Sequence, residues 1–217
     1  MMIGSTILEW LFPTKCAFCH RLTGGWEQRV CPKCVRELPY TCGGAAEQKL
    51  PNIEKCVSPL YYEGTVRDSL LRYKFNGLRT YCNVYSDLIV KTIDERGVSC
   101  DIITWVPLSR KRLRRRGYDQ ARLIAESAAK ALGADCVPLL KKTRNIKAQS
   151  LTGGAKERRK NVSGVYAPIN IGLIRDKRIL IFDDIVTTGA TLSECASVLR
   201  RCGAKSVTAA TVARKRV

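Results

Sequence analysis

Histidine is almost absent from this chain of 217 residues, in which His20 is the single example. Serine and cysteine hydrolases commonly use a histidine as the general base that activates the nucleophile. His20 directly follows Cys19 in a cysteine-rich stretch, and we expect it to be a surface residue rather than a metal ligand. A hydrolase with a histidine-containing triad is therefore set aside.

Long apolar segments are also absent from the sequence. The longest uninterrupted runs, such as residues 179–182, fall far short of the ~20 residues that a membrane-spanning helix needs. The N-terminal residues lack the basic start and the small-residue cleavage site of a secretory signal, and Glu9 interrupts their short apolar stretch. We therefore expect a cytoplasmic protein that does not insert into membranes.

Acidic residues are half as numerous as basic ones, 19 against 38, and the formal net charge is +19 at pH 7. The excess is concentrated in two segments. Residues 110–122 hold seven basic residues and one acidic residue, and residues 141–160 hold eight and one. Such segments favour phosphate-rich ligands, although a solvated loop would have the same composition.

Cysteine is abundant, but the total of eleven is odd, and seven of the eleven show no paired spacing. Both facts argue against a disulfide-based fold. The other four form two C-x-x-C pairs, Cys16 with Cys19 and Cys31 with Cys34. Two such turns can direct four thiolates to one point and complete a tetrahedral zinc site. We predict one structural zinc here; the alternatives are a redox-active pair and a coincidence among many cysteines.

A division of the chain into two parts follows from this prediction. About 40 residues cannot form a stable core alone, and metal binding can supply the missing folding energy. Residues 43–59 carry glycines and prolines near both ends and are interpreted as a linker. We expect a zinc-ribbon module with its linker over residues 1–57 and a main domain over residues 58–217. Cys42 and Cys56 are assigned no role.

The main domain alternates two kinds of pattern. Apolar residues recur at helical spacing in some segments, and β-branched apolar runs form others. The alternation predicts an α/β fold, in which a mostly parallel, doubly wound sheet has helices on both faces and binds ligands at the carboxyl ends of its strands. The expected helices cover residues 65–75, 81–96, 119–132 and 191–202, and the expected strands cover residues 101–108, 178–182 and 206–212.

The most informative segment is ILIFDDIVTTGAT, residues 179–191. Its apolar start predicts a buried strand, and Asp183 and Asp184 follow where that strand is expected to end. A glycine at position 189 lets backbone approach a ligand closely, and the N–H groups of the turn, at a helix N-terminus, can bind a phosphate. The two carboxylates can accept hydrogen bonds from vicinal ribose hydroxyls. The segment therefore fits a ribose phosphate, with Thr187, Thr188, Gly189, Ala190 and Thr191 as candidate phosphate-binding residues.

An acidic pair after an apolar strand is common on its own, as in receiver-like proteins or in an ordinary strand-end turn. As thirteen residues in a strand–turn–helix context, however, the segment resembles the phosphoribosyl pyrophosphate signature of type I phosphoribosyltransferases. Further segments resemble the ComF family, whose members join an N-terminal zinc ribbon to a phosphoribosyltransferase-like domain. These segments are KFNG at 74–77, VPLSRKR at 106–112, RGYDQ at 116–120, QSL at 149–151, RR at 158–159 and NV at 161–162.

Many bacterial members of that family are implicated in DNA uptake during natural transformation. The resemblance implies phosphoribosyl pyrophosphate as ligand, Mg²⁺ bridging its pyrophosphate and ribose oxygens, and proteins of DNA uptake or helicases as candidate partners. It also implies that Ser109, Arg110 and Lys111 face the pyrophosphate and that residues 141–160 form a loop that closes over the site. Asp183 and Asp184 would be the catalytic residues, by holding the ribose while pyrophosphate departs.

Thr187 stands where purine-salvage relatives carry a carboxylate, so a base-activating acid is missing from that place. The acceptor, and whether transfer takes place at all, are left open. Two classes of function remain: a Mg²⁺-dependent phosphoribosyltransferase, and an accessory protein that binds single-stranded DNA through its basic segments, with Tyr118 stacking on bases. A ligand-responsive sensor, in which the 141–160 loop is ordered for a partner, is a third reading.

Overall fold

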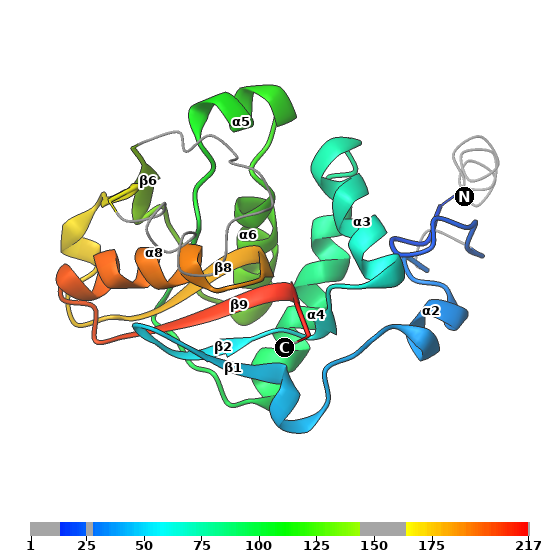
Figure 1. The fold of residues 1–217 in the computed structure, drawn as a ribbon, viewed down its shortest axis with the longest axis horizontal. Helices are drawn as coiled ribbons and strands as arrows, with labels where there is room; N and C mark the ends of the chain where they lie inside the picture. The colour runs from blue at the N-terminus through cyan, green and yellow to red at the C-terminus, as the bar shows by residue number, and fades with distance from the viewer. Residues whose placement is uncertain (1–13, 25–27, 144–163, 217) are drawn as a thin grey trace, which may run out of the picture.

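The computed structural model describes residues 14–24, 28–143 and 164–216, and a seven-stranded sheet lies at its centre (Figure 1). The strand order is β1-β2-β9-β8-β4-β5, with β3 also paired to β9. Every pairing in this sheet is parallel except that of β1 with β2. The strands are β1 (Glu47–Leu50), β2 (Ile53–Val57), β3 (Leu60–Tyr61), β4 (Ile102–Trp105), β5 (Asp135–Cys136), β8 (Arg178–Val186) and β9 (Ser206–Arg214).

Helices cover both faces of the sheet, with α8 in front and α4 and α6 behind in Figure 1. Because successive side chains of a strand point to opposite faces, β8 feeds both cores. Ile179 and Ile181 pack with α8, whereas Leu180 and Phe182 pack with the helices behind. The predicted α/β class with a mostly parallel sheet is confirmed. The helices are α3 (Gly64–Phe75), α4 (Tyr81–Glu95), α6 (Gln120–Leu132) and α8 (Ala190–Arg201).

The interpretation of residues 43–59 as a linker is wrong. After a 3₁₀ turn, η1 (Gly43–Ala46), the chain forms β1 and β2, and Cys56 of β2 is paired in parallel with Ala209 of β9. The glycines and prolines fall in the turns beside these short strands and do not mark a free connection. We propose that the boundary of the N-terminal module lies ahead of β1.

Two further differences bear on the site. The strand expected over residues 178–182 continues to Val186, so Asp183 and Asp184 lie within β8 and not beyond it. The basic segment after β4, which was not among the expected helices, forms a helix, α5 (Arg110–Arg116). Its residues are good helix formers, Ser109 is its N-cap and Gly117, at φ 76°, is its C-cap.

The N-terminal module packs directly on α3 and α4. The hydroxyl of Ser69 in α3 donates to the carbonyl oxygen of Ala17 at 2.5 Å, and the guanidinium of Arg72 donates to the carbonyl oxygen of Phe18. His20 Nδ1 lies 3.0 Å from the hydroxyl of Tyr81 at the start of α4. The module is therefore fixed to the sheet-bearing domain by polar contacts to its backbone.

The remaining elements are short. They are α2 (Pro32–Glu37) in the N-terminal module, the antiparallel pair β6 (Leu140–Lys142) and β7 (Tyr166–Pro168), and η2 (Ile171–Leu173). Among the described helices, none combines the length and the apolar character needed to cross a membrane.

Candidate functional site

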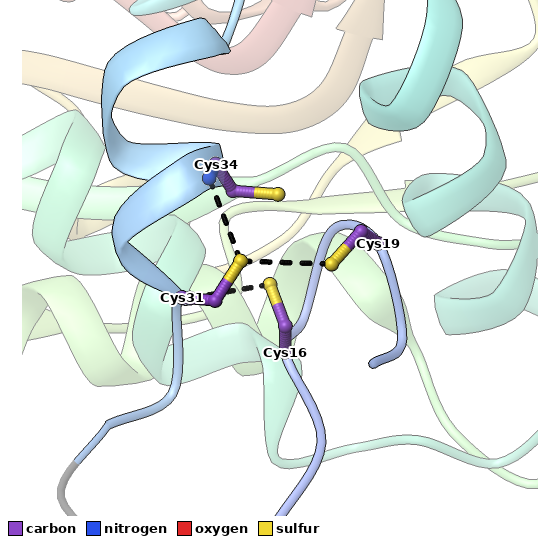
Figure 2. Close-up of side chains that lie close together, drawn as sticks. All are labelled: Cys16, Cys19, Cys31 and Cys34. Atoms are coloured by element: carbon purple, nitrogen blue, oxygen red, sulfur yellow. Dashed lines mark hydrogen bonds between the residues drawn. The ribbon is translucent and has the colours of Figure 1, made fainter. Parts of the chain in front are cut away.

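The four cysteines of the two C-x-x-C pairs converge on one point in the N-terminal module (Figure 2). Their sulfur atoms all lie within 4.8 Å of one another, and the sulfurs of Cys19 and Cys31 are 3.6 Å apart. A tetrahedral zinc with Zn–S bonds near ~2.3 Å places its sulfurs about 3.8 Å apart. The cluster therefore fits a zinc ion.

Local structure places each pair of thiols. Cys31 is the N-cap of α2, and its sulfur accepts a hydrogen bond from the backbone N–H of Cys34. Cys31 itself donates its N–H to the sulfur of Cys16. His20 follows the first C-x-x-C pair at φ 62°, a left-handed conformation that allows the chain to turn tightly after Cys19. Burial would raise the pKa of Cys19, but hydrogen bonds led by Arg21 lower it, whereas burial and hydrogen bonds from the other thiols raise the pKa of Cys34.

The acidic pair lies at the carboxyl end of β8, where its two side chains point to opposite faces. Asp184 forms an ion pair with Lys74 of α3, with 2.8 Å between Nζ and Oδ2, and both side chains are mostly buried. Asp183 Oδ1 accepts the backbone N–H of Asp184 at 2.8 Å. Burial, followed by the charge of Asp184, raises the pKa of Asp183 to about 8.

A cavity of about 180 Å³ opens over this pair. Four cationic side chains and three carboxylates line it, so the cavity is polar and carries charges of both signs. Asp119 accepts the N–H of Leu108 at 2.9 Å and thereby fixes the backbone after β4 at the cavity edge. The charged lining residues are Lys74, Arg112, Arg116, Lys142, Asp119, Asp183 and Asp184, and the lining also includes Gln120, Tyr166 and Thr191.

The predicted phosphate turn forms a second, smaller hollow of about 40 Å³, lined by residues 183 and 185–192. Asp183 and Thr191 line both the hollow and the larger cavity. Gly189 has φ 72° and caps α8, while Thr188 accepts the N–H of Ala190 on its hydroxyl oxygen. Thr187 is exposed. The structure therefore brings the predicted phosphate-binding residues and the acidic pair into one site.

An alanine at position 189 is expected to be unfavourable, mainly because of the left-handed backbone there and also because the side chain of Leu50 would have to shift. A Cβ at position 189 would overlap the side chain of Leu50 in β1, and the left-handed backbone adds about 1–2 kcal/mol of strain. Gly189→Ala should therefore lower the thermal midpoint and weaken binding of a phosphate ligand. Gly172→Ala, at an unobstructed position without positive φ, is the matched control. Equal thermal midpoints for the two variants would contradict the expected backbone strain at position 189, and unchanged phosphate affinity in Gly189→Ala would contradict the role of this turn in binding.

The three residues predicted to face pyrophosphate lie elsewhere than in the cavity lining. Ser109 is buried, and its hydroxyl oxygen accepts the N–H of Arg112 at 3.4 Å as the cap of α5. Arg110 and Lys111 are exposed on α5 and do not line the cavity. Instead, the cavity is lined by Arg112 and Arg116, which lie four residues apart and hence on one face of the helix.

Sequence reasoning missed several cavity residues because they are distant in the chain. Lys142 of β6 donates from Nζ to the hydroxyl of Tyr166 in β7 at 3.1 Å. Burial, followed by the charge of Arg112, lowers the pKa of Lys142. Spacing could have found Arg112 and Arg116 had a helix been expected there, but no local signal pairs Lys142 with Tyr166. Residues 144–160 of the predicted closing loop lie outside the described residues.

Tyr118, the aromatic residue invoked for stacking on single-stranded DNA, is only 6% exposed. Its hydroxyl donates to the backbone carbonyl of Tyr73, and its ring lies 5.8 Å from that of Tyr73. A base cannot stack on a ring that is buried in this way. The structure therefore does not favour the DNA-binding alternative.

Comparison with known families gives the class of the domain. Residues 120–217 match the phosphoribosyl transferase domain. This segment contains α6, whose first residue, Gln120, lines the cavity, and it also contains the acidic pair and the phosphate turn. The chain thus carries a phosphoribosyltransferase-type domain.

Known relatives extend the match to most of the chain. Competence protein F of Haemophilus influenzae is 27% identical over 188 residues, which cover 82% of this chain and 81% of that protein. Competence protein ComFC of Streptococcus pneumoniae is 28% identical, covering 88% and 84%. DNA utilization protein YhgH of Escherichia coli is 28% identical, covering 88% and 86%. The resemblance to the ComF family is confirmed.

Proposed function

We propose that the chain binds phosphoribosyl pyrophosphate together with Mg²⁺ and transfers its phosphoribosyl group to an acceptor. The single observation that carries this proposal is that Asp183 lines both the phosphate hollow and the larger cavity, which Asp184 and four cationic side chains also line. In this arrangement, one site offers separate surfaces for a phosphate, a sugar and a pyrophosphate.

Each part of the donor has a matching group. The 5-phosphate occupies the turn of residues 187–191, where the backbone N–H groups and the start of α8 favour an anion. The ribose hydroxyls donate to Asp183 and Asp184. Arg112 and Lys142, which both line the cavity near Asp183, bind the pyrophosphate. Carboxylate oxygens such as those of Asp183 and Asp184 would be suitable ligands for a Mg²⁺ ion bound with the donor, which would neutralise pyrophosphate charge.

The transfer step is a substitution at C1 of the ribose. A nucleophilic atom of the acceptor bonds to C1 as the bond from C1 to the pyrophosphate oxygen breaks, and the electron pair of that bond leaves with pyrophosphate. A proton carried by the attacking atom passes to solvent. The protein contributes positioning and stabilisation of charge, since the threonine at position 187 cannot act as a base.

The names of the relatives suggest the process that this chemistry serves. Two relatives are named competence proteins and one a DNA utilization protein, and we propose a role of this chain in DNA uptake or utilisation. All eleven cysteines are free in the structure. Free thiols favour a reducing compartment, which supports the expected cytoplasmic location.

Calorimetric titration of the zinc-loaded chain with phosphoribosyl pyrophosphate, with and without Mg²⁺, tests the proposal. Binding should require Mg²⁺ and should tighten with pH, because a raised pKa leaves Asp183 mostly protonated at pH 7 and its carboxylate is needed to accept the hydroxyls. A pKa of about 8 predicts about tenfold tighter binding at pH 9 than at pH 7. Affinity that is flat over this range would contradict the role of Asp183.

The free energy of unfolding of the ligand-free chain should fall as the pH rises from 7 to 9, whereas donor affinity should rise. A carboxyl whose pKa is higher in the folded chain than in the unfolded chain binds more protons when folded. Its contribution is fully present below pH 4 and is lost as the pH rises through 8, so the free chain should unfold more easily at pH 9 than at pH 7.

A further inference from the structure

Two side chains on one wall of the cavity form a pair with spare hydrogen-bond donors. Arg116 of α5 donates from a terminal guanidinium nitrogen to Gln120 Oε1 at 2.7 Å, which fixes the orientation of the Gln120 amide. Gln120 Nε2 and Arg116 Nε are then both buried without a partner, and Gln120 is only 1% exposed. Both residues line the cavity.

Buried donors without partners are rare in folded proteins, because each loses its hydrogen bonds to water. Six such side-chain atoms occur in the described part of the chain, and two of them belong to this pair. N–H donors on one wall of a cavity, one of them on a cation, match the oxygens of a carboxylate or another oxyanion. The pair is therefore preorganised for a ligand that bears an acidic group.

This pair lies on the Asp184 side of the acidic motif, whereas Lys142, which is assigned to the pyrophosphate, lies on the Asp183 side. Asp183 points toward α8, on the side of Ile179 and Ile181, and Asp184 points toward the rear helices, where it meets Lys74 of α3. The charge of Asp184 also acts on Arg116, whereas the charge of Asp183 acts on Lys142. The cavity thus has two cationic ends, Lys142 and Arg116, with Arg112 between them, since its charge acts on both.

An aromatic ring adjoins the second cationic end. The guanidinium carbon of Arg116 lies 5.0 Å from the centre of the Phe75 ring, and Phe75 is 58% exposed although it is a large apolar residue. A flat, exposed ring beside a cation suits a planar ligand and offers nothing to a pyrophosphate.

We propose that Arg116 and Gln120, with Phe75 beside them, form the acceptor subsite, and that the acceptor is a planar nitrogen-containing ring that carries a carboxylate. This inference rests on the proposed phosphoribosyl transfer and names the substrate class of that reaction. A nitrogen on the acceptor attacks C1 as described above, while the carboxylate accepts hydrogen bonds from Gln120 Nε2 and the Arg116 guanidinium.

The test measures pyrophosphate release by the full, zinc-loaded chain with Mg²⁺ and phosphoribosyl pyrophosphate. Orotate, nicotinate and anthranilate serve as acidic rings, and adenine, hypoxanthine and uracil as neutral ones. We expect release with an acidic ring and much slower release with every neutral ring. Donor affinity is measured separately by calorimetry, so that loss of the acceptor and loss of the donor are distinguished.

Three variants locate the subsite. Gln120→Leu, which removes the unpaired donor at similar volume, should raise the KM for the acidic acceptor about tenfold. Its donor affinity should stay within about twofold of the wild-type value, since donor contacts are unchanged. Gln120→Glu, which retains the hydrogen bond to Arg116, should lose acceptor binding at least as strongly. Arg115→Met, on the exposed side of the same helix, is the control and should leave both constants unchanged.

Several outcomes would overturn the inference. The first is faster pyrophosphate release with a neutral ring than with any acidic ring. The second is donor binding with no pyrophosphate release in the presence of any acidic ring. The third is an equal loss of donor and acceptor affinity in Gln120→Leu, which would assign the pair to pyrophosphate. Unchanged acceptor affinity in Gln120→Glu would show a structural role only, and this variant decides the question if Gln120→Leu fails to fold. Failure of the wild-type chain to bind the donor would remove the proposed function and this inference with it.

Discussion

Replacing Asp183 and Asp184 together by asparagine should abolish Mg²⁺-dependent binding of phosphoribosyl pyrophosphate. Asp183 lines both the phosphate hollow and the larger cavity, Asp184 lines the larger cavity, and asparagine keeps the size of each side chain while removing its carboxylate. At pH 9, where Asp183 is ionised, two charge-assisted hydrogen bonds at about 1.5–3 kcal/mol each correspond to a loss of affinity on the order of a hundredfold or more.

The same substitutions should leave the fold intact. Asp183 is held in surroundings that disfavour its charge, so a neutral side chain removes an electrostatic cost there. In Asp184→Asn, Lys74 loses its ionic partner, and a modest drop in thermal midpoint is expected. The matched control is Asp87→Asn with Asp94→Asn, which removes two exposed charges from α4. Donor binding that survives in the site variant would remove the acidic pair from the site.

Removal of the metal from the four-cysteine cluster should lower the thermal midpoint of the whole chain. Zinc supplies most of the folding energy of modules of this size, and the knuckle backbone is bonded to α3 through Ser69 and Arg72. In a chain of this length the midpoint falls by about 2–4 °C for each kcal/mol of stability lost, so the drop should be readily measured by calorimetry. Metal analysis should find one zinc per chain.

A cysteine variant separates the metal site from general loss of thiols. Cys34→Ser removes a buried ligand and should reproduce the effect of a chelator, whereas Cys42→Ser changes an exposed cysteine outside the cluster and should have no effect. A chelator that leaves the midpoint and the reactivity of the thiols unchanged would show that the cluster holds no metal.

The parts of the site that the sequence could predict are those encoded within a few consecutive residues. The cysteine spacing and the segment 179–191 carry their geometry locally, since a turn or a strand–turn–helix unit fixes the positions of its own residues. Their positions in the structure follow the prediction closely, although β8 runs four residues further than its apolar core because pairing with β9 continues past Phe182.

The parts that could not be predicted depend on tertiary contacts. Lys74 reaches Asp184 across 110 positions of sequence, and Lys142 meets Tyr166 only because β6 and β7 pair. The helix α5 has one apolar residue, so its sequence shows no amphipathic period. The sequence therefore could not indicate which of its basic side chains face the cavity and which face solvent. Composition located the basic segment correctly, but only the helix shows which of its arginines reach the cavity.

The β1–β2 hairpin limits how this chain can be divided for experiment. A truncated chain that begins after residue 57 would lose β2 and leave β9 with a long unpaired edge, which is a ready template for aggregation. It would also lose Leu50, which packs against the phosphate turn at Gly189. Insolubility of such a fragment would therefore reflect a broken sheet and would say nothing about whether the zinc-binding module is needed for folding.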